Sequence, residues 1–349
     1  MSSDRDALKL LRGLVGTYSP SGKEGPVAVQ LRNWLSARSG FDRVAMDEAG
    51  NVIASTGKGP YLLLCSHMDT VPGKLSVSFE NDQIRGRGAV DAKGSLAAMC
   101  VAASRCAAAG VKSFVYAAVV GEEKDGKGMK HLLSKRLPYV GGVFGEPSGG
   151  GIVVGYRGRL GFELTVKGKT AHASSAALGV NAVEEAMRIA LQLKAELTAL
   201  GCAASITIIQ GGKAQNVIPN RCRFSCDVRI PPSVRLDDVL KAVEARASAD
   251  VELITSELTP PINVGRANRV FGAASAAVRD AGQQPRALIK VGTSDMNTFY
   301  TTTGKPCVAY GPGDASLSHT EHETISISDY LNSVEVYSLL VRKVLSPRG

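Results

Sequence analysis

Tyr61-Leu-Leu-Leu-Cys65 runs directly into Ser66-His-Met-Asp69. Such a short, wholly apolar run is typical of a strand buried on both faces of a parallel sheet. The pattern of an apolar run followed by a polar side chain recurs at Phe114–Val120, at Gly142–Phe144 and at Cys307–Tyr310. Because these runs alternate with helical patterns, the sequence predicts an α/β fold with a mostly parallel sheet.

Each of these runs precedes residues that can bind a metal. Ligands collect beyond the carboxyl ends of strands in open α/β sheets, so we expect the side chains to meet at one edge. Borderline divalent metals prefer imidazole and carboxylate. Hydrolysis of an unactivated amide needs an activated water and a stabilised oxyanion, and two metals supply both. The residues that predict such a hydrolytic site are His67, Asp91, Glu122, Glu123, Glu146 and His319.

Taken singly, these residues also have ordinary structural explanations. His67 could close a strand against a turn, and Asp91 could be the N-cap of the small-residue helix that follows it. Glu122 and Glu123 could lie in an exposed loop, although adjacent carboxylates at the end of a buried strand repel each other unless a cation is near. The other candidates could face solvent. Only a metal site accounts for all of them together.

The middle of the chain has a different pattern, in which strands and helices follow the order β-α-β-β-α-β. The predicted segments are Arg159–Lys167, Gly179–Leu200, Ala203–Gln210, Arg221–Ile230, Leu236–Ala247 and Val251–Leu258. This order is that of a ferredoxin-like unit. We therefore predict a discontinuous catalytic domain, residues 1–154 and 263–349, with an inserted ferredoxin-like α+β domain at 155–262.

Composition limits the partners of the chain. Its net charge of +9 suggests an acidic partner. Nucleic acid is not expected, because Lys and Arg are spread along the chain and aromatic residues make up only 5%. The charged N-terminus and the lack of a long apolar stretch predict a cytoplasmic protein without a membrane span. The seven cysteines form no Cys-x-x-Cys pair, so free buried thiols are expected.

Five motifs carry a resemblance that covers almost the whole chain. They are Ser66-His-Met-Asp-Thr-Val-Pro-Gly73, Gly86-Arg-Gly-Ala-Val-Asp-Ala-Lys-Gly94, Gly121-Glu-Glu123, Gly145-Glu-Pro-Ser148 and His319-Thr-Glu-His-Glu323. Together they resemble the dinuclear zinc amidohydrolases, a family that includes succinyl-diaminopimelate desuccinylase, acetylornithine deacetylase, aminoacylase and glutamate carboxypeptidase. The resemblance implies two divalent metal ions, Zn²⁺ or Co²⁺.

The resemblance also implies a role for each metal ligand. Asp91 would bridge the two ions. His67 and Glu146 would complete one site, while Glu123 and His319 would complete the other.

Two more carboxylates would act beside the metals. Asp69 would orient His67, as carboxylates do for metal-bound imidazoles. Glu122 would be the general base that takes a proton from water and hands it to the leaving amine.

Further residues match the family's substrate contacts. His172, in Lys169-Thr-Ala-His172, matches a lid histidine that reaches an active site across a homodimer. Asn216 and Arg229 match lid segments that hold the substrate, and an Arg suits a carboxylate because its fork is bidentate. Thr293 and Ser294 match a substrate-facing turn. For His172 and Arg229, an ordinary surface position is the alternative.

The leading functional hypothesis is a branch of this family that releases lysine or ornithine from an acidic amino-group carrier protein. The bond cut there joins the amino acid to the side chain of the carrier's terminal glutamate. The basic charge of the chain suits such a carrier. A deacylase of acetylornithine, acetyl-lysine or succinyl-diaminopimelate is the alternative, and a dipeptidase or carboxypeptidase comes third. A non-catalytic binding protein with the same fold is an alternative from a different class. Such a protein should have lost a metal ligand or the base, whereas here every expected position is filled.

Overall fold

A computed structural model describes residues 3–346 of the chain, which divide into two compact units. The larger unit contains the residues up to Val154, Val264–Ile289 and those from Ser294 on. The inserted unit contains Gly155–Asn263 and Lys290–Thr293.

The boundaries of the inserted unit differ in two respects from the predicted limits of 155–262, and the first is that the unit extends one residue further, to Asn263. The second is that residues Lys290–Thr293 group with it although they are distant in sequence. One reason is that the Lys290 carbonyl oxygen accepts a hydrogen bond from the Arg157 amide, at 3.1 Å. The functional division into a catalytic domain and a lid stays a prediction.

The main sheet has a parallel centre and antiparallel edges. Its strands, in order across the sheet, are β1 (Arg43–Met46), β2 (Val52–Thr56), β6 (Phe114–Val119), β3 (Tyr61–His67), β7 (Tyr139–Gly145), β15 (Cys307–Tyr310), β8 (Ile152–Tyr156) and β13 (Ile262–Asn263), with β14 (Ala287–Lys290) also paired to β8. Strands β6, β3, β7 and β15 run parallel, as their unbroken apolar sequences predict. The predicted α/β class is confirmed.

Helices cover this sheet, and a smaller sheet lies apart from it. The helices of the larger unit are α1 (Asp4–Gly16), α2 (Gly25–Ser36), α3 (Lys93–Ala108), α4 (Lys127–Ser134), α7 (Arg269–Asp280), α8 (Asp295–Thr303) and α9 (Ile327–Leu345), with a 3₁₀ turn η2 at Ala315–Leu317. The smaller sheet pairs β16 (Thr324–Ser326), β5 (Gln83–Arg85) and β4 (Ser78–Glu80) in that order.

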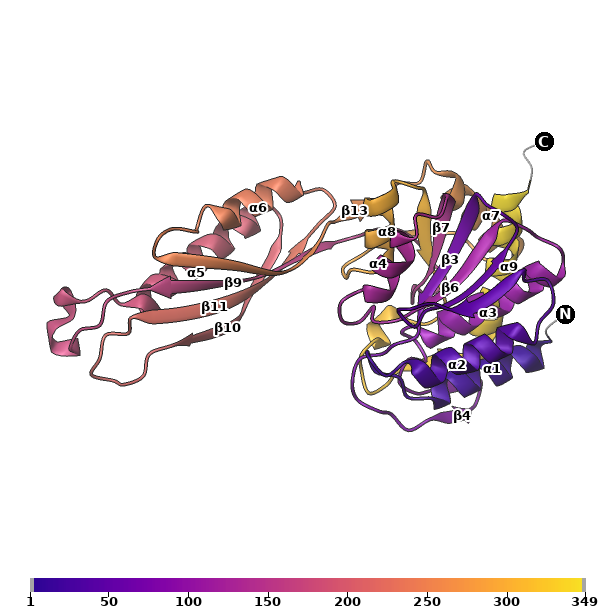
Figure 1. The fold of residues 1–349 in the computed structure, drawn as a ribbon, viewed down its shortest axis with the longest axis horizontal. Helices are drawn as coiled ribbons and strands as arrows, with labels where there is room; N and C mark the ends of the chain where they lie inside the picture. Colours follow the sequence, from indigo (N-terminus) through magenta and orange to yellow (C-terminus); the bar gives the residue numbers. More distant parts are fainter. Residues whose placement is uncertain (1–2, 347–349) are drawn as a thin grey trace. The chain divides into compact units, whose positions relative to one another are not determined.

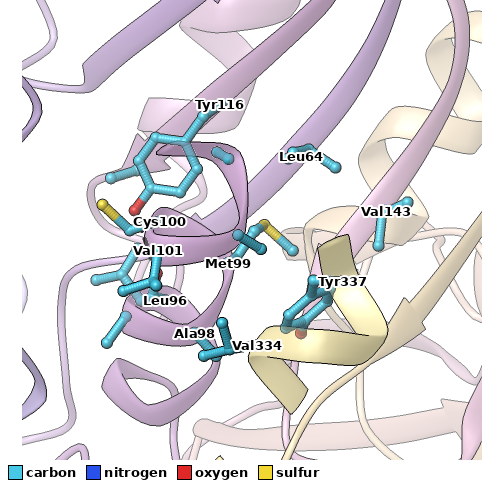
Figure 2. Close-up of a cluster of buried hydrophobic side chains, with 14 of the residues drawn as sticks. Leu64, Leu96, Ala98, Met99, Cys100, Val101, Tyr116, Val143, Val334 and Tyr337 are labelled. Atoms are coloured by element: carbon cyan, nitrogen blue, oxygen red, sulfur yellow. Dashed lines mark hydrogen bonds between the residues drawn. The ribbon is translucent and has the colours of Figure 1, made fainter. Parts of the chain in front are cut away.

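The core of the larger unit centres on α3, which is buried along most of its length. Its many alanines let α9 and the sheet approach closely, so Met99 and Cys100 lie between them. Figure 2 shows Tyr116 and Val143 of the sheet and Tyr337 of α9 around the α3 side chains of this cluster, with Tyr116 beside Cys100. Because α3 is fixed by this packing, the residues just before it are held at the edge of the sheet.

The inserted unit has the predicted ferredoxin-like arrangement. Its elements are, in chain order, β9 (Gly158–Lys167), η1 (Ala173–Leu178), α5 (Ala182–Ala199), β10 (Ala203–Gly211), β11 (Arg221–Ile230), α6 (Leu236–Glu244) and β12 (Val251–Thr259). The antiparallel sheet has the order β10-β11-β9-β12, and α5 and α6 cover one of its faces (Figure 1). Phe162 and Phe224 fill the core under the helices. The other face of the sheet carries no helix of this unit.

Two sequence-based expectations concern the chain as a whole. The seven cysteines are all buried free thiols, as predicted. Between residues 3 and 346, no helix combines the length and the hydropathy that a membrane span requires.

Candidate metal centre

Three neighbouring parallel strands deliver candidate ligands to one edge of the main sheet. Strand β3 ends at His67, and β7 ends just before Glu146. After β6, the chain turns at Gly121, whose φ of 71° is in the left-handed region, and continues into Glu122 and Glu123. Because β6, β3 and β7 are adjacent and parallel, their carboxyl ends meet.

The carboxylate of Asp91 lies between two imidazoles. Its Oδ1 is 3.3 Å from Nε2 of His67, and its Oδ2 is 3.4 Å from Nε2 of His319. The same His319 nitrogen is 3.0 Å from Oε1 of Glu123. Ligand atoms of His67, Asp91 and Glu123 all lie within 4.8 Å of one another. The carboxylate thus offers one oxygen to each imidazole, an arrangement that fits the bridging role predicted for Asp91.

Asp91 does not cap the helix that follows it. The N-cap position of α3 is Ala92, and no side chain there bonds to the first turn. The N-cap explanation is therefore wrong for this residue, because its carboxylate points to the histidines instead.

The Asp69 carboxylate holds both the first histidine and the glutamate pair. The backbone oxygen of Asp69 is 3.0 Å from Nδ1 of His67, and its Oδ1 is 3.5 Å from the same nitrogen. The carboxylate accepts hydrogen bonds from the backbone amides of Glu122 and Glu123, each at 3.1 Å. It also accepts one from Oγ of Ser21, at 2.6 Å. The arrangement fits the orienting role that the sequence predicts for Asp69.

Glu323 holds the loop that carries Asp91, and sequence reasoning assigned it no role. It is 1% exposed, and its Oε1 accepts from the amides of Gly88 at 2.9 Å, Val90 at 3.1 Å and Asp91 at 2.9 Å. Its Oε2 pairs with Nη1 of Arg87 at 3.0 Å. Arg87 and Glu323 each lie within one of the motifs quoted above, Gly86–Gly94 and His319–Glu323. Their presence in these motifs was the signal from which a role could have been predicted.

Acidic side chains are crowded at this edge. Burial, together with the charges of Glu146, Asp295 and Glu123, raises the pKa of Glu122 well above its usual value. Burial raises the pKa of Asp295 to about 7. Asp295 begins α8, and the sequence placed it in the predicted substrate-facing turn Gly292–Asp295 without giving it a role of its own. Crowded buried carboxylates of this kind need cations, or protons, to be stable.

The pKa values of the two imidazoles are also raised, which in their case favours the charged form. Burial disfavours the charged form of His67, but hydrogen bonds to Asp69 and Asp91 outweigh it and raise its pKa well above the usual value. Hydrogen bonds to Asp91 and Glu123 raise the pKa of His319 to about 10. His319 is half exposed and has a φ of 66°. Both imidazoles thus lie where positive charge is favoured.

The residues present fit a divalent metal centre. Imidazole nitrogens and carboxylate oxygens converge, and these are ligands for zinc-type ions. The solvent-exposed alternatives for Glu122, Glu123 and Glu146 are wrong, because all three side chains are buried or partly buried. Glu146 is 8% exposed and lies close enough to Glu122 for their charges to repel.

The predicted substrate residues of the inserted unit lie in two loops and one strand. His172 is exposed, and its Nδ1 is 2.8 Å from Oγ of Ser174. Asn216 is exposed in the loop before β11. Arg229 is on β11, and its Nε donates to Oδ1 of Asp227 at 2.6 Å. A substrate carboxylate would have to share this guanidinium with Asp227.

The two predicted turn residues, Thr293 and Ser294, belong to different units. Thr293 is partly exposed and belongs to the inserted unit. Ser294 is 5% exposed and caps α8, where its Oγ accepts from the Met296 amide at 3.2 Å. Asn297 completes a capping box with Ser294. Substrate contact by these residues stays a prediction.

Comparison with known proteins identifies the family. The model of peptidase family M20/M25/M40 matches residues 63–343. The chain belongs to this family. The match contains every residue of the metal centre described above, and the predicted metal-dependent amidohydrolase is confirmed as the class of enzyme. Divalent metal ions are its cofactors.

Several named proteins are similar to this chain over nearly its whole length. A putative [LysW]-lysine/[LysW]-ornithine hydrolase of Aeropyrum pernix is 34% identical over 95% of this chain and 94% of its own length. One from Pyrobaculum aerophilum is 36% identical over 97% of this chain and 98% of its own. The [LysW]-lysine hydrolase of Deinococcus radiodurans is 31% identical over 97% of each chain.

Solved structures of the family share the fold. A tripeptidase from Staphylococcus aureus has a TM-score of 0.80 and 26% identity, over 98% of this chain and 100% of its own. A dinuclear metal-binding peptidase from Bacillus subtilis has a TM-score of 0.75 and 18% identity, over 98% of each chain. The two-unit architecture is therefore that of the family.

Proposed function

We propose that this enzyme releases lysine or ornithine from an amino-group carrier protein by hydrolysis of a γ-glutamyl amide. The observation that carries the proposal is the end-to-end similarity to hydrolases of [LysW]-lysine and [LysW]-ornithine. Identities of 31% to 36% extend over at least 94% of those proteins. The sequence analysis reached the same substrate from motifs and charge. The enzyme would therefore act in lysine or arginine biosynthesis, in the cytoplasm.

The site contains the parts that amide hydrolysis requires. Two divalent ions held here would acidify water and polarise the amide carbonyl. Glu122 would take the proton of the attacking water and return it to the nitrogen of the leaving amine. Asp69 would keep His67 and the backbone of Glu122 in place.

Zinc or cobalt are the ions that we expect, with Asp91 between them. His67 and Glu146 would hold one ion, and Glu123 and His319 the other. Support for this arrangement comes from the two imidazoles, because each lies beside a different carboxylate oxygen of Asp91. The structural relative from Bacillus subtilis is described as dinuclear.

A homodimer is the expected assembly. On the inserted unit, Met187 and Leu191 of α5 are 49% and 61% exposed. Next to α5, the edge strand β10 exposes Ile209, which is 50% accessible. An apolar helix face beside an unpaired strand edge is a surface that another copy can cover. In such a dimer His172 could contribute to catalysis.

Substrate competition tests the proposed function. Metal-loaded enzyme would receive carrier-protein–lysine, carrier-protein–ornithine, acetyl-lysine, acetylornithine and succinyl-diaminopimelate, and mass spectrometry would quantify the amino acid released. We expect the highest kcat/KM on a carrier conjugate. Preference for a small acyl substrate would instead establish the deacylase alternative and leave the roles of the metal ligands unchanged.

A further inference from the structure

A groove lies on the inserted unit, along the face of its sheet that no helix of the unit covers. It has a volume of about 990 Å³, and the ends of β9, β10 and β11 line it. Along β11, Arg221 and Arg223 alternate with the buried residues Cys222 and Phe224, which places the two arginines on the open face. Lys167 is the register partner of Arg221, so it lies on the same face.

Positive charge predominates in this groove. Lys167, Lys213, Arg221 and Arg223 line it, whereas Glu252 is the acidic residue among its lining. Lys167, Lys213 and Arg221 form no ion pair with any residue between 3 and 346. Arg223 is 3.8 Å from Glu163, which is the outer limit of an ion pair. Three exposed cations therefore lack an ion-pair partner among the residues that the structure describes.

The other half of the same sheet face is electrically balanced. Arg159 pairs with Asp227 and with Glu257, at 2.7 Å in each case. Arg229 pairs with Asp227 at 2.6 Å. On this sheet face, the cations without an ion-pair partner among the described residues thus lie toward the groove, and an acidic partner would be attracted to that half.

The groove adjoins the two loops that are predicted to reach the substrate. Val217, which lines it, forms a β-bridge with His172. The carbonyl oxygen of Asn216 accepts from the Ala173 amide at 2.9 Å. A protein held in the groove therefore lies next to His172 and Asn216 within a single unit.

We propose that this groove docks an acidic surface of the carrier protein whose terminal residue is hydrolysed. The proposal rests on the proposed function. Only the terminal residue and its amino acid need to enter the metal centre, so the rest of an acidic carrier must lie on surface outside it. A groove of cations beside His172 and Asn216 has the complementary charge and adjoins the predicted substrate loops.

The test compares a protein substrate with a small one. The double variant Lys213→Glu/Arg221→Glu and the wild type would be assayed on carrier-protein–lysine and on γ-glutamyl-lysine, at low and at moderate salt. We expect KM for the carrier conjugate to rise by about tenfold or more at low salt, with kcat little changed. The difference should shrink with added salt, since screening weakens exposed charges. Turnover of the small amide should be unaffected.

A matched control carries the same change of charge on the helix-covered side of the unit. In Arg235→Glu/Lys241→Glu, both side chains are exposed on or beside α6. Equal losses in the control, or equal losses on both substrates, would overturn the docking groove. So would unchanged kinetics of the groove variant on a conjugate that the wild type cleaves. If the wild type itself leaves the conjugate intact while cleaving acetylornithine, the proposed function fails and the groove proposal with it.

Discussion

The Glu323 carboxylate accepts a hydrogen bond from the backbone amide of Asp91, at 2.9 Å. The partner of Glu323, Arg87, donates from Nη1 to the Thr320 carbonyl oxygen at 3.1 Å and from Nε to that of Gly73 at 2.9 Å. One buried ion pair therefore ties the loop of Asp91 to the segment that begins at His319. It holds in place two candidate ligands, Asp91 and His319, that are more than 200 positions apart in the chain.

Glu323→Gln should weaken metal binding without removing a ligand. The amide keeps one acceptor but loses the charge that faces Arg87, so the Asp91 loop should loosen. We expect metal affinity to fall by about 10- to 100-fold, the size typical of outer-shell partners. Metal titration of chelator-treated protein measures this. Glu321→Gln is the control, because that side chain is exposed nearby and should leave affinity unchanged.

Glu122→Gln should lower turnover strongly while metal content and fold persist. Without the carboxylate, nothing else at this position can take the proton of the attacking water, and kcat should fall by about 10²- to 10⁴-fold. Glu123→Gln is the matched comparison at the adjacent position and should lower metal content instead. Retained turnover in Glu122→Gln would rule out its role as the base.

Asp91→Asn should cost both metal ions, whereas His319→Gln should cost one. The difference follows from the position of the Asp91 carboxylate between the two imidazoles. Elemental analysis after dialysis gives the number of ions per chain. Equal metal content in wild type and Asp91→Asn would mean that Asp91 bridges nothing.

The metal-free protein should lose stability as the pH rises from about 7 to 10. Hydrogen bonds to Asp91 and Glu123 raise the pKa of His319 to about 10. A pKa raised above the ordinary value of about 6.5 means that the imidazolium stabilises the folded state fully below that pH and loses this effect toward 10. Thermal unfolding of chelator-treated protein across this range measures it. In His319→Gln the decline should be smaller; an identical decline would contradict the assignment.

Leu191→Glu should separate the expected dimer. The side chain is 61% exposed on α5, and a charge there would be buried if another copy covers it. Light scattering should then give the mass of one chain, and activity should drop if His172 acts across the interface. Ile289→Glu is the control, since Ile289 is 53% exposed on the larger unit. A monomeric wild type would exclude the dimer at once.

Much of the fold could be predicted because it follows from local sequence patterns. The run at Cys307–Tyr310 and that at Arg221–Ile230 coincide with β15 and β11. Where a predicted element and the observed one begin at different residues, the pattern of apolar residues did not define the first residue. Gly179–Leu200 was expected as one helix, but α5 begins at Ala182, where the Asn181 side chain caps it. An N-cap residue sets the first residue of a helix more sharply than the periodicity of apolar residues can show.

The metal centre was predictable only in part. The sequence by itself determined which residue types follow the buried strands, because strand ends are set by apolar runs and parallel strands end at one edge. It did not distinguish a capping role for Asp91 from a ligand role. The structure excludes the capping role and places Asp91 3.4 Å from His319, which the fold brings from the far end of the chain.

The distribution of charge shows the same division. The sequence determined a net charge of +9 with Lys and Arg spread along the chain. Only the tertiary structure decided that Arg159 and Arg229 pair with carboxylates, while Lys167, Lys213 and Arg221 form no ion pair within residues 3–346. The physical reason is distance. Electrostatic interaction depends on separation in space, and strand pairing sets that separation between residues far apart in sequence.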